Sequence, residues 1–242
     1  MIKAEPLVVR SLQLAEGPVR SVVFDLNGVL TTDMNRNLAH LNQLYDTSME
    51  PKAIREVWWP LYLAASVGDI DARELWHRLG QVVAGGELPR REPSRYWLSL
   101  IGPRESGLRQ TLGQLGRHYS LGVMSNHVGE WARSLLARFG LSPLVDAVLI
   151  SSDLGVRKPA EEIYARICEM LNVEPSSAIY VADEEEDLLA AAGIGMRPVF
   201  LPGEEATSAV GVEIRRVSDL LPLLQHARAS SAVLESGQSS GM

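Results

Sequence analysis

The sequence predicts an α/β protein in which a doubly wound, Rossmann-like parallel sheet carries an inserted helical cap domain. Two observations lead to this prediction. In the second half of the chain, short apolar runs alternate with amphipathic stretches of helical length, as is typical of a parallel sheet covered by helices. After the first apolar run, in contrast, a long stretch has apolar residues at helical spacing and lacks short β-type runs. With 242 residues, the chain is long enough to bury such a core.

The first strand is predicted at residues 20–25, where residues 22–24 (Val-Val-Phe) form a continuous apolar run. Asp25 follows this run directly, and Gly28 indicates a tight turn. In parallel α/β sheets, ligands bind in the crevice beyond the carboxyl ends of the strands. Asp25 is therefore either a catalytic nucleophile or metal ligand, or a residue that only ends a strand.

Residues 33–103 are predicted to form the helical insertion. Asp71 is the expected N-cap of one of its helices, with Glu74 three residues later as in a capping box. Four of the five tryptophans lie in this stretch, and we interpret them mainly as core residues. Trp58 and Trp59 are adjacent on a helix and point about 100° apart, so one of the two is free to face the cleft.

From residue 104 onward, strands and helices alternate. Further strands are expected at 119–125, 145–150, 178–182 and 198–201, and helices at 106–117, 129–139, 160–172 (with Pro159 at its first position), 186–193 and 216–226. These elements divide the chain into a core of residues 1–32 and 104–226, the cap of residues 33–103, and a disordered tail rich in Ser, Ala and Gly at 227–242.

Composition excludes several classes of protein. The formal net charge is −7 and no run is dense in Lys or Arg, so we expect no nucleic-acid partner. Cys168 is the single cysteine, which rules out an internal disulfide and fits a reducing compartment. No apolar run approaches the roughly 20 residues that span a bilayer, and the N-terminus lacks the layout of a signal peptide. We therefore expect a cytoplasmic protein with no membrane partner.

Polar residues of complementary type follow four of the predicted strands. They are Asp25, Ser125 with Asn126, Lys158 after Arg157, and Asp183 followed by the acidic run to Asp187. The carboxyl ends of parallel strands point the same way, so these residues converge on one crevice. Two carboxylates suit Mg²⁺, and a lysine with a hydroxyl suits phosphoryl oxygens. Asp25 could then attack phosphorus in line.

The ordered set of motifs resembles the haloacid dehalogenase (HAD) superfamily. The matching segments are Phe-Asp-Leu-Asn-Gly-Val-Leu at 24–30, Val-Met-Ser-Asn at 123–126, Gly-Val-Arg-Lys-Pro at 155–159 and Tyr-Val-Ala-Asp-Glu-Glu-Glu-Asp at 180–187. The resemblance covers nearly the whole chain, and residues 33–103 stand where this family inserts a small helical cap between its first two motifs.

The resemblance implies a role for each site residue. Asp25 is the nucleophile, Lys158 stabilises charge, and Ser125 binds the phosphoryl group. Asn126 is also expected to bind substrate. Asp183 holds Mg²⁺ alone or with Asp187, and the backbone carbonyl of Asn27 completes the metal shell. The implied substrate is a small phosphorylated metabolite.

Asn27 departs from the family pattern, because phosphatases of the family have there a second Asp that acts as general acid and base. An amide cannot deliver a proton to a leaving alcohol, and general acid–base help is worth typically ~10²–10⁴-fold. The first interpretation is a Mg²⁺-dependent phosphatase weakened by Asn27. The alternatives are a metal-independent hydrolase of the dehalogenase type and a catalytically impaired HAD fold that binds or regulates.

Overall fold

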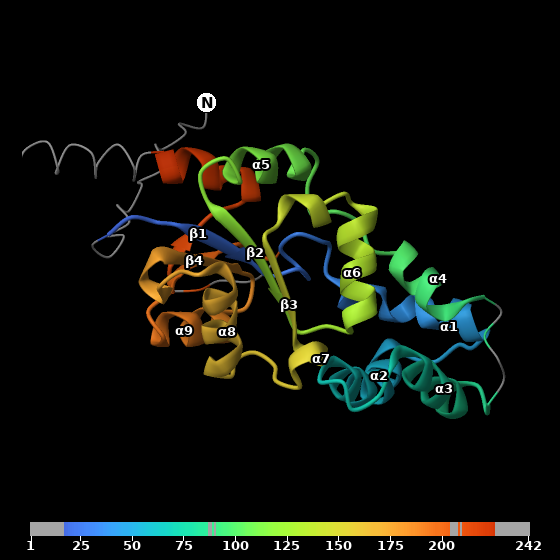
Figure 1. Ribbon diagram of the computed structural model, residues 1–242. Coiled ribbons are helices and arrows are strands. Elements are labelled where there is room, and N and C mark those ends of the chain that lie inside the picture. The colour runs from blue at the N-terminus through green and yellow to red at the C-terminus, as the bar shows by residue number, and fades with distance from the viewer. Residues whose placement is uncertain (1–16, 87–88, 90, 204–207, 209, 226–242) are drawn as a thin grey trace, which may run out of the picture.

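The computed structural model describes residues 17–86, 89, 91–203, 208 and 210–225 (Figure 1), so the predicted tail at 227–242 lies outside the described residues. The centre of the fold is a six-stranded parallel sheet in the order β3-β2-β1-β4-β5-β6. The strands are β1 (Ser21–Phe24), β2 (Ser120–Ser125), β3 (Ala147–Ile150), β4 (Ala178–Ala182), β5 (Arg197–Phe200) and β6 (Val212–Glu213). The order reverses between β1 and β4, which makes the end of β1 the topological switch point.

Helices cover both faces of the sheet. On one face lie α5 (Leu108–Leu115) and α6 (Gly129–Arg138), and on the other α8 (Glu161–Leu171) and α9 (Glu185–Gly193). Alternation along β1 explains the two layers, because Val22 and Phe24 pack with the first pair of helices and Val23 packs with the second. The predicted doubly wound parallel sheet is confirmed.

Shorter elements complete the core. They are η2 (Ser142–Leu144), α7 (Ser151–Leu154), η3 (Pro175–Ser177) and η4 (Val217–Asp219), and η4 is followed by helical residues 220–225. The predicted position of Pro159 is wrong. Helix α8 begins at Glu161 with Ala160 as N-cap, and Pro159 precedes this cap in a cis peptide bond with Lys158.

Within the described residues, the segment between β1 and α5 contains helices only. They are η1 (Met34–His40), α1 (Leu41–Tyr45), α2 (Pro51–Ser66), α3 (Ala72–Val83) and α4 (Pro93–Ser99). Helices α1–α4 lie together on the right of Figure 1, beside α6. The side chain of Asp71 caps α3 by accepting a hydrogen bond from the Glu74 main-chain N–H at 2.7 Å.

A tryptophan cluster joins this helical insert to the core. Trp58 of α2 stacks on Trp131 of α6 at 6.2 Å between ring centroids, and its centroid lies 4.9 Å from that of Trp97 of α4. Trp76 of α3 lies 5.5 Å from Trp131. All four belong to one continuous apolar cluster with one face of the sheet. The insert is therefore packed onto α6 through large aromatic surfaces.

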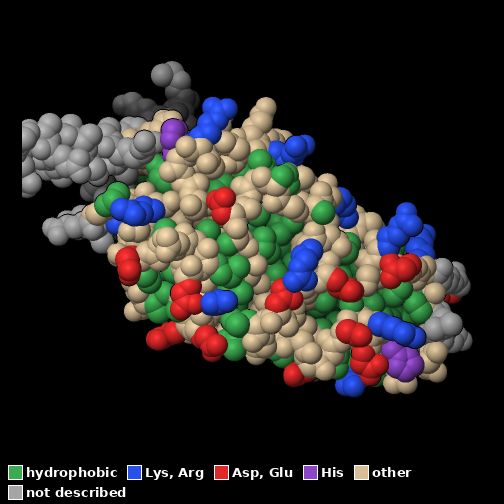
Figure 2. Space-filling view, in the orientation of Figure 1, with side chains coloured by type: hydrophobic (Ala, Val, Ile, Leu, Met, Phe, Trp, Pro, Cys, Tyr) green, Lys and Arg blue, Asp and Glu red, His purple; other side chains and the backbone are tan. Residues whose placement is uncertain are grey.

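Acidic and basic side chains are interspersed over the face shown in Figure 2. In the part of the chain that the structure describes, we find no helix with both the length and the apolar character that a membrane crossing requires.

Candidate active site

All seven predicted site residues line one cavity of about 480 Å³ at the carboxyl ends of the central strands. They are Asp25, Asn27, Ser125, Asn126, Lys158, Asp183 and Asp187. Because β1 pairs with β2 on one side and with β4 on the other, the residues at the ends of these strands are brought together, although Asp25 and Asp183 lie more than 150 positions apart in sequence.

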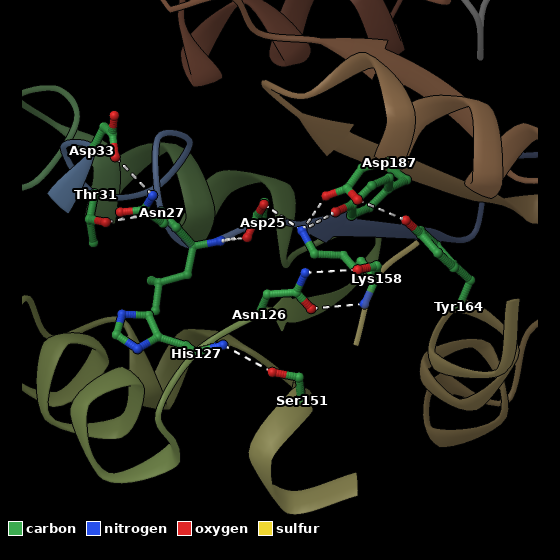
Figure 3. Close-up of polar contacts among 12 residues, drawn as sticks. Asp25, Asn27, Thr31, Asp33, Asn126, His127, Ser151, Lys158, Tyr164 and Asp187 are labelled. Carbon is green, nitrogen blue, oxygen red and sulfur yellow. Dashed lines mark hydrogen bonds and ion pairs between the residues drawn. The ribbon is translucent and has the colours of Figure 1, made fainter. Parts of the chain in front are cut away.

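Asp25 follows β1 and is 6% exposed. Its Oδ1 accepts a hydrogen bond of 2.6 Å from the main-chain N–H of Leu26, and its Oδ2 lies 2.5 Å from Nζ of Lys158 (Figure 3). Burial raises the pKa of Asp25, and the adjacent ammonium of Lys158 opposes this rise. The side chain is thus a fixed, buried carboxylate at the switch point of the sheet.

Lys158 is the positive centre of the cavity. Its Nζ contacts Asp25 at 2.5 Å and Asp187 at 2.6 Å, and it donates to the hydroxyl of Tyr180 at 2.9 Å. Burial alone would lower the pKa of Lys158, but the two carboxylates outweigh it and the net pKa is raised. Lys158 is therefore charged at neutral pH and held in one position by three partners.

Asp187 is committed to Lys158. One of its oxygens pairs with Nζ of Lys158, and the other accepts a hydrogen bond of 3.3 Å from the hydroxyl of Tyr164 (Figure 3). The arrangement makes Asp187 a support for the lysine.

Ser125 is the last residue of β2 and Asn126 follows it, and the two side chains differ in whether their polar atoms already have hydrogen-bond partners. The Oγ of Ser125 is buried and has no hydrogen-bond partner among the described residues, although it lines the cavity. The amide of Asn126 is already used, because its Oδ1 accepts from the main-chain N–H of Lys158 at 2.8 Å and its Nδ2 donates to the Lys158 carbonyl at 3.0 Å. Ser125 thus offers an unused donor to a ligand, whereas Asn126 fixes the backbone that carries Lys158.

Asp183 lies directly over Gly28. A Cβ placed on Gly28 would stand 1.9 Å from Oδ2 of Asp183, and Gly28 has a φ of +78°, so only glycine fits this turn. Arg104 holds the turn from behind by donating to the Gly28 carbonyl. Burial, followed by the neighbouring Asp25 and Glu184 charges, raises the pKa of Asp183 to about 7. The buried carboxylate of Asp25 and the half-buried carboxylate of Asp183 are thereby brought to one end of the cavity.

Asn27 turns its side chain away from Asp25 and towards the start of the insert. Its Oδ1 accepts from the main-chain N–H of Met34 at 2.9 Å, and its Nδ2 donates to Oδ1 of Asp33 at 3.1 Å (Figure 3). Asp33 in turn caps η1 by accepting from the N–H of Asn35. The position that departs from the family pattern thus links the end of β1 to the insert.

Few described side chains are placed to ligate a metal ion. Among the described residues, no three His, Cys, Asp or Glu side chains come together as a metal site. Mg²⁺, however, is typically bound by one or two carboxylates together with waters and substrate phosphates. Asp25 and Asp183 provide such a pair, and the space above Gly28 that a Cβ would fill receives the Asp183 carboxylate. The residues present therefore fit Mg²⁺.

A model of the haloacid dehalogenase-like hydrolases matches residues 19–195, which is most of the chain. The chain belongs to the haloacid dehalogenase-like hydrolases. The HAD resemblance inferred from the four motifs is confirmed.

Among curated relatives of this HAD-like hydrolase, validoxylamine A 7'-phosphate phosphatase of Streptomyces hygroscopicus subsp. limoneus is 35% identical over 91 residues. That match covers 37% of this chain and 43% of the relative, so the chain spans less than half of that protein. A phosphatase of Mycobacterium tuberculosis is 28% identical over 215 residues, which are 86% of this chain and 98% of the relative.

Solved structures share the fold of this HAD-like hydrolase. A HAD phosphatase from Thermococcus onnurineus superposes with a TM-score of 0.64 at 23% identity, covering 85% of this chain and 98% of that one. The L-2-haloacid dehalogenase of Xanthobacter autotrophicus, with chloropropionic acid covalently bound, gives a TM-score of 0.64 at 20% identity over 86% and 98% of the two chains. Phosphatases and dehalogenases thus have the same architecture as this chain.

Several residues that line or support the cavity of this HAD-like hydrolase are not predicted by the sequence motifs. Tyr180 and Tyr164 support Lys158 and Asp187 from β4 and α8, and a phenol in an apolar run gives no sequence signal of such a role. Helix α2 adds Trp59 and Tyr62, the latter through a hydrogen bond of 2.9 Å from its hydroxyl to the Asn126 carbonyl. Trp58 is buried and Trp59 lines the cavity, in line with the expected divergence of this pair.

His127 stays outside the cavity. It is 1% exposed, its Nδ1 accepts from the main-chain N–H of Val128, and its ring packs edge-on against Tyr62 and Trp131. Its main-chain N–H donates to Ser151, whose hydroxyl bonds to the Ser66 carbonyl at the end of α2. The histidine is therefore a packing residue at the junction between the insert and the core.

Proposed function

We propose that this chain is a Mg²⁺-dependent phosphatase that acts on a small phosphate monoester through an aspartyl-phosphate on Asp25. The single observation that carries the proposal is the buried pair of Asp25 and Lys158, 2.5 Å apart at the end of β1, beside the unpartnered hydroxyl of Ser125. Relatives named as phosphatases support the same reaction class.

The chain's own residues divide the work as follows. Oδ2 of Asp25 forms a bond to phosphorus while the bond from phosphorus to the leaving oxygen breaks. Lys158 and the Ser125 hydroxyl bind the phosphoryl oxygens and stabilise the charge that spreads over them in the transition state. Water then attacks the phosphoryl group, and the carboxylate of Asp25 is released together with inorganic phosphate.

Asp25, Asp183 and the main-chain carbonyl of Asn27 would hold Mg²⁺. When bound, the ion supplies positive charge that neutralises the phosphoryl oxygens. Because Asp187 is committed to Lys158 and Tyr164, we propose that it positions the lysine and is not a ligand of the ion. We propose for Asn126, likewise, the role of holding the backbone at Lys158.

The helical insert is proposed to act as the cap, since α2 forms one wall of the cavity through Trp59 and Tyr62. A cytoplasmic location is also proposed, which the lone, buried thiol of Cys168 supports.

Turnover of p-nitrophenyl phosphate with and without Mg²⁺ tests the proposal. We expect Mg²⁺-dependent release of phosphate, and Asp25→Asn should lower it by ~10³-fold or more, because the nucleophile is lost while the shape of the side chain is kept. Asp69→Asn, an exposed change in the insert, is the matched control and should keep the parent rate. An unchanged rate in Asp25→Asn would refute the nucleophile, and metal-independent halide release from 2-haloacids would favour a dehalogenase.

A further inference from the structure

Helix α2 presents one polar and aromatic stripe to the cavity. Arg55, Trp59 and Tyr62 stand at i, i+4 and i+7, which places them on the same helix face, and all three line the cavity. The adjacent stripe of Ile54, Trp58 and Ala65 is buried in the apolar cluster. Packing therefore fixes which face of α2 is turned to the cavity.

A second arginine reaches the same cavity from the core. Arg157 directly precedes Lys158 and is half-buried. Arg157 lines the cavity together with Tyr62 of α2. The loop before α8 and the wall of α2 thus bring two guanidinium groups to one cavity.

Neither guanidinium has a partner among the described residues. Some arginines are engaged with main-chain carbonyls, namely Arg104 with those of Gly28 and Pro202 and Arg138 with those of Leu98 and Ile101. Arg55 and Arg157, in contrast, make no ion pair or side-chain hydrogen bond in the described part of the chain. Arg55 is exposed and Arg157 is half-buried, and as two unpaired cations that line one cavity they offer binding capacity to an anion.

Acidic and basic side chains line different parts of the cavity, depending on the element from which they come. The acidic lining residues follow β1 and β4, and they are Asp25, Asp33, Asp183, Glu184, Glu186 and Asp187. The cations Arg157 and Lys158 follow β3, and Arg55 comes from α2. Lys158 lies at Asp25 and is assigned to the transferred phosphoryl group, so the arginines are the cations that remain for a distinct group of the substrate.

We propose that the substrate carries a second anionic group, a carboxylate or a second phosphate, which Arg55 and Arg157 bind while Trp59 forms an apolar wall beside the linking carbons. This inference rests on the proposed phosphatase function and specifies its substrate class. A planar guanidinium binds carboxylate or phosphate through two parallel hydrogen bonds, which makes both arginines suited to either source of the anion.

A series of synthetic esters tests the proposal. Carboxyalkyl phosphates with one to four methylene groups are each compared with the n-alkyl phosphate of equal length, and a parallel series carries a terminal phosphate. We expect the anionic ester to have a kcat/KM at least about tenfold higher than its neutral partner at the best length, as for a charge-assisted pair. The series with the higher ratio identifies the anion.

The ratio of kcat/KM for the charged ester to kcat/KM for the neutral ester should fall to about threefold or less in Arg55→Gln and in Arg157→Gln, because each variant loses one guanidinium. Arg73→Gln, an exposed change on α3, is the matched control and should keep the full ratio. A ratio of kcat/KM values within one variant cancels differences in the folded fraction. Equal kcat/KM for charged and neutral esters in the parent enzyme, or an unchanged ratio in both variants, would overturn the proposal.

Binding of the same esters to the Asp25→Asn variant, measured by calorimetry, tests the anion site independently of the proposed phosphatase activity. If the parent turns over no phosphate ester, the function fails, yet a tenfold preference of Asp25→Asn for the charged ester would still support the anion site. If turnover depends on Asp25 but neither turnover nor binding distinguishes charged from neutral esters, the function stands and the anion site is refuted.

Discussion

At the scale of single residues, the site depends on a glycine that contributes no side chain. Gly28→Ala forces a φ of +78° on alanine and brings Cβ to 1.9 Å from Oδ2 of Asp183. The backbone conformation costs about 1–2 kcal/mol, and the larger effect should fall on activity, because Asp183 must leave its place. We expect turnover to drop by ~10²-fold, as misplacement by about 1 Å does at other sites.

Gly193→Ala is the matched control for this change. Gly193 ends α9, and a Cβ there meets no atom within 4 Å. Steady-state kinetics with chemical unfolding of both variants makes the comparison. If Gly28→Ala and Gly193→Ala had the same turnover, the placement of Asp183 over Gly28 would be wrong.

His127 makes folding stability depend on pH. Burial lowers its pKa to about 4, whereas an unfolded histidine has a pKa of about 6.5. Between these values the unfolded chain binds more protons, so this group lowers the free energy of unfolding as the pH falls from 6.5 to 4, by up to about 1.4 kcal/mol per pH unit. Above pH 6.5 its contribution is constant.

Urea unfolding at pH 7 and pH 5 checks this expectation. The parent should lose about 2 kcal/mol more than His127→Asn between the two values, since asparagine can still accept the hydrogen bond from Val128 but does not titrate. An identical loss in both proteins would show that His127 does not titrate on unfolding.

At the scale of elements, three helices meet at one hydroxyl. Oγ of Ser94 on α4 accepts hydrogen bonds from Nε1 of Trp76 on α3 at 2.8 Å and from Nε1 of Trp131 on α6 at 3.1 Å. Ser94→Ala leaves two largely buried indole N–H groups without this acceptor. We expect a loss of about 1–3 kcal/mol in the free energy of unfolding, measured by denaturant titration.

Ser99→Ala on the same helix provides the comparison. Its hydroxyl donates to the Tyr96 carbonyl, one turn earlier in α4, and its loss should cost less than about 0.5 kcal/mol. Equal effects of the two substitutions would mean that Ser94 does not join the helices.

Elements with strong local patterns are the ones that the sequence predicts well. The strands that end at Asp25 and Ser125 are buried apolar runs, and their ends converge because parallel topology requires it. Strand β6 has two residues, too few for a pattern. Pro159 was misplaced because a proline before a helix is compatible both with its first turn and with the loop that precedes it.

Partners that depend on tertiary packing could not be predicted. No spacing rule relates Asn27 to Asp33, because their contact depends on how η1 leaves the sheet. The roles of Tyr164 and Tyr180 likewise follow from the packing of α8 on β4. The motifs thus predicted which strand-end residues line the cavity, whereas the side chains that support those residues appear only in three dimensions.

At the scale of the whole molecule, the insert and the core share one apolar cluster that runs from β1 through α2–α4 to α6. We expect them to unfold together. Differential scanning calorimetry should show a single transition whose calorimetric and van't Hoff enthalpies agree. A separate transition at lower temperature, assigned to α2–α4 by loss of tryptophan fluorescence, would show instead that the insert is an independent unit.

In the proposed reaction, Asp25 becomes phosphorylated during turnover. The amide of Asn27 cannot take a proton from the attacking water, so the second half of the reaction should be slow and the phosphorylated enzyme should accumulate. Rapid acid quench of the enzyme mixed with p-nitrophenyl phosphate and Mg²⁺, followed by peptide mass spectrometry, measures this directly. We expect one phosphoryl group on Asp25 and none in Asp25→Asn. Phosphate release without a modified Asp25 at any quench time would refute the proposed phosphoenzyme.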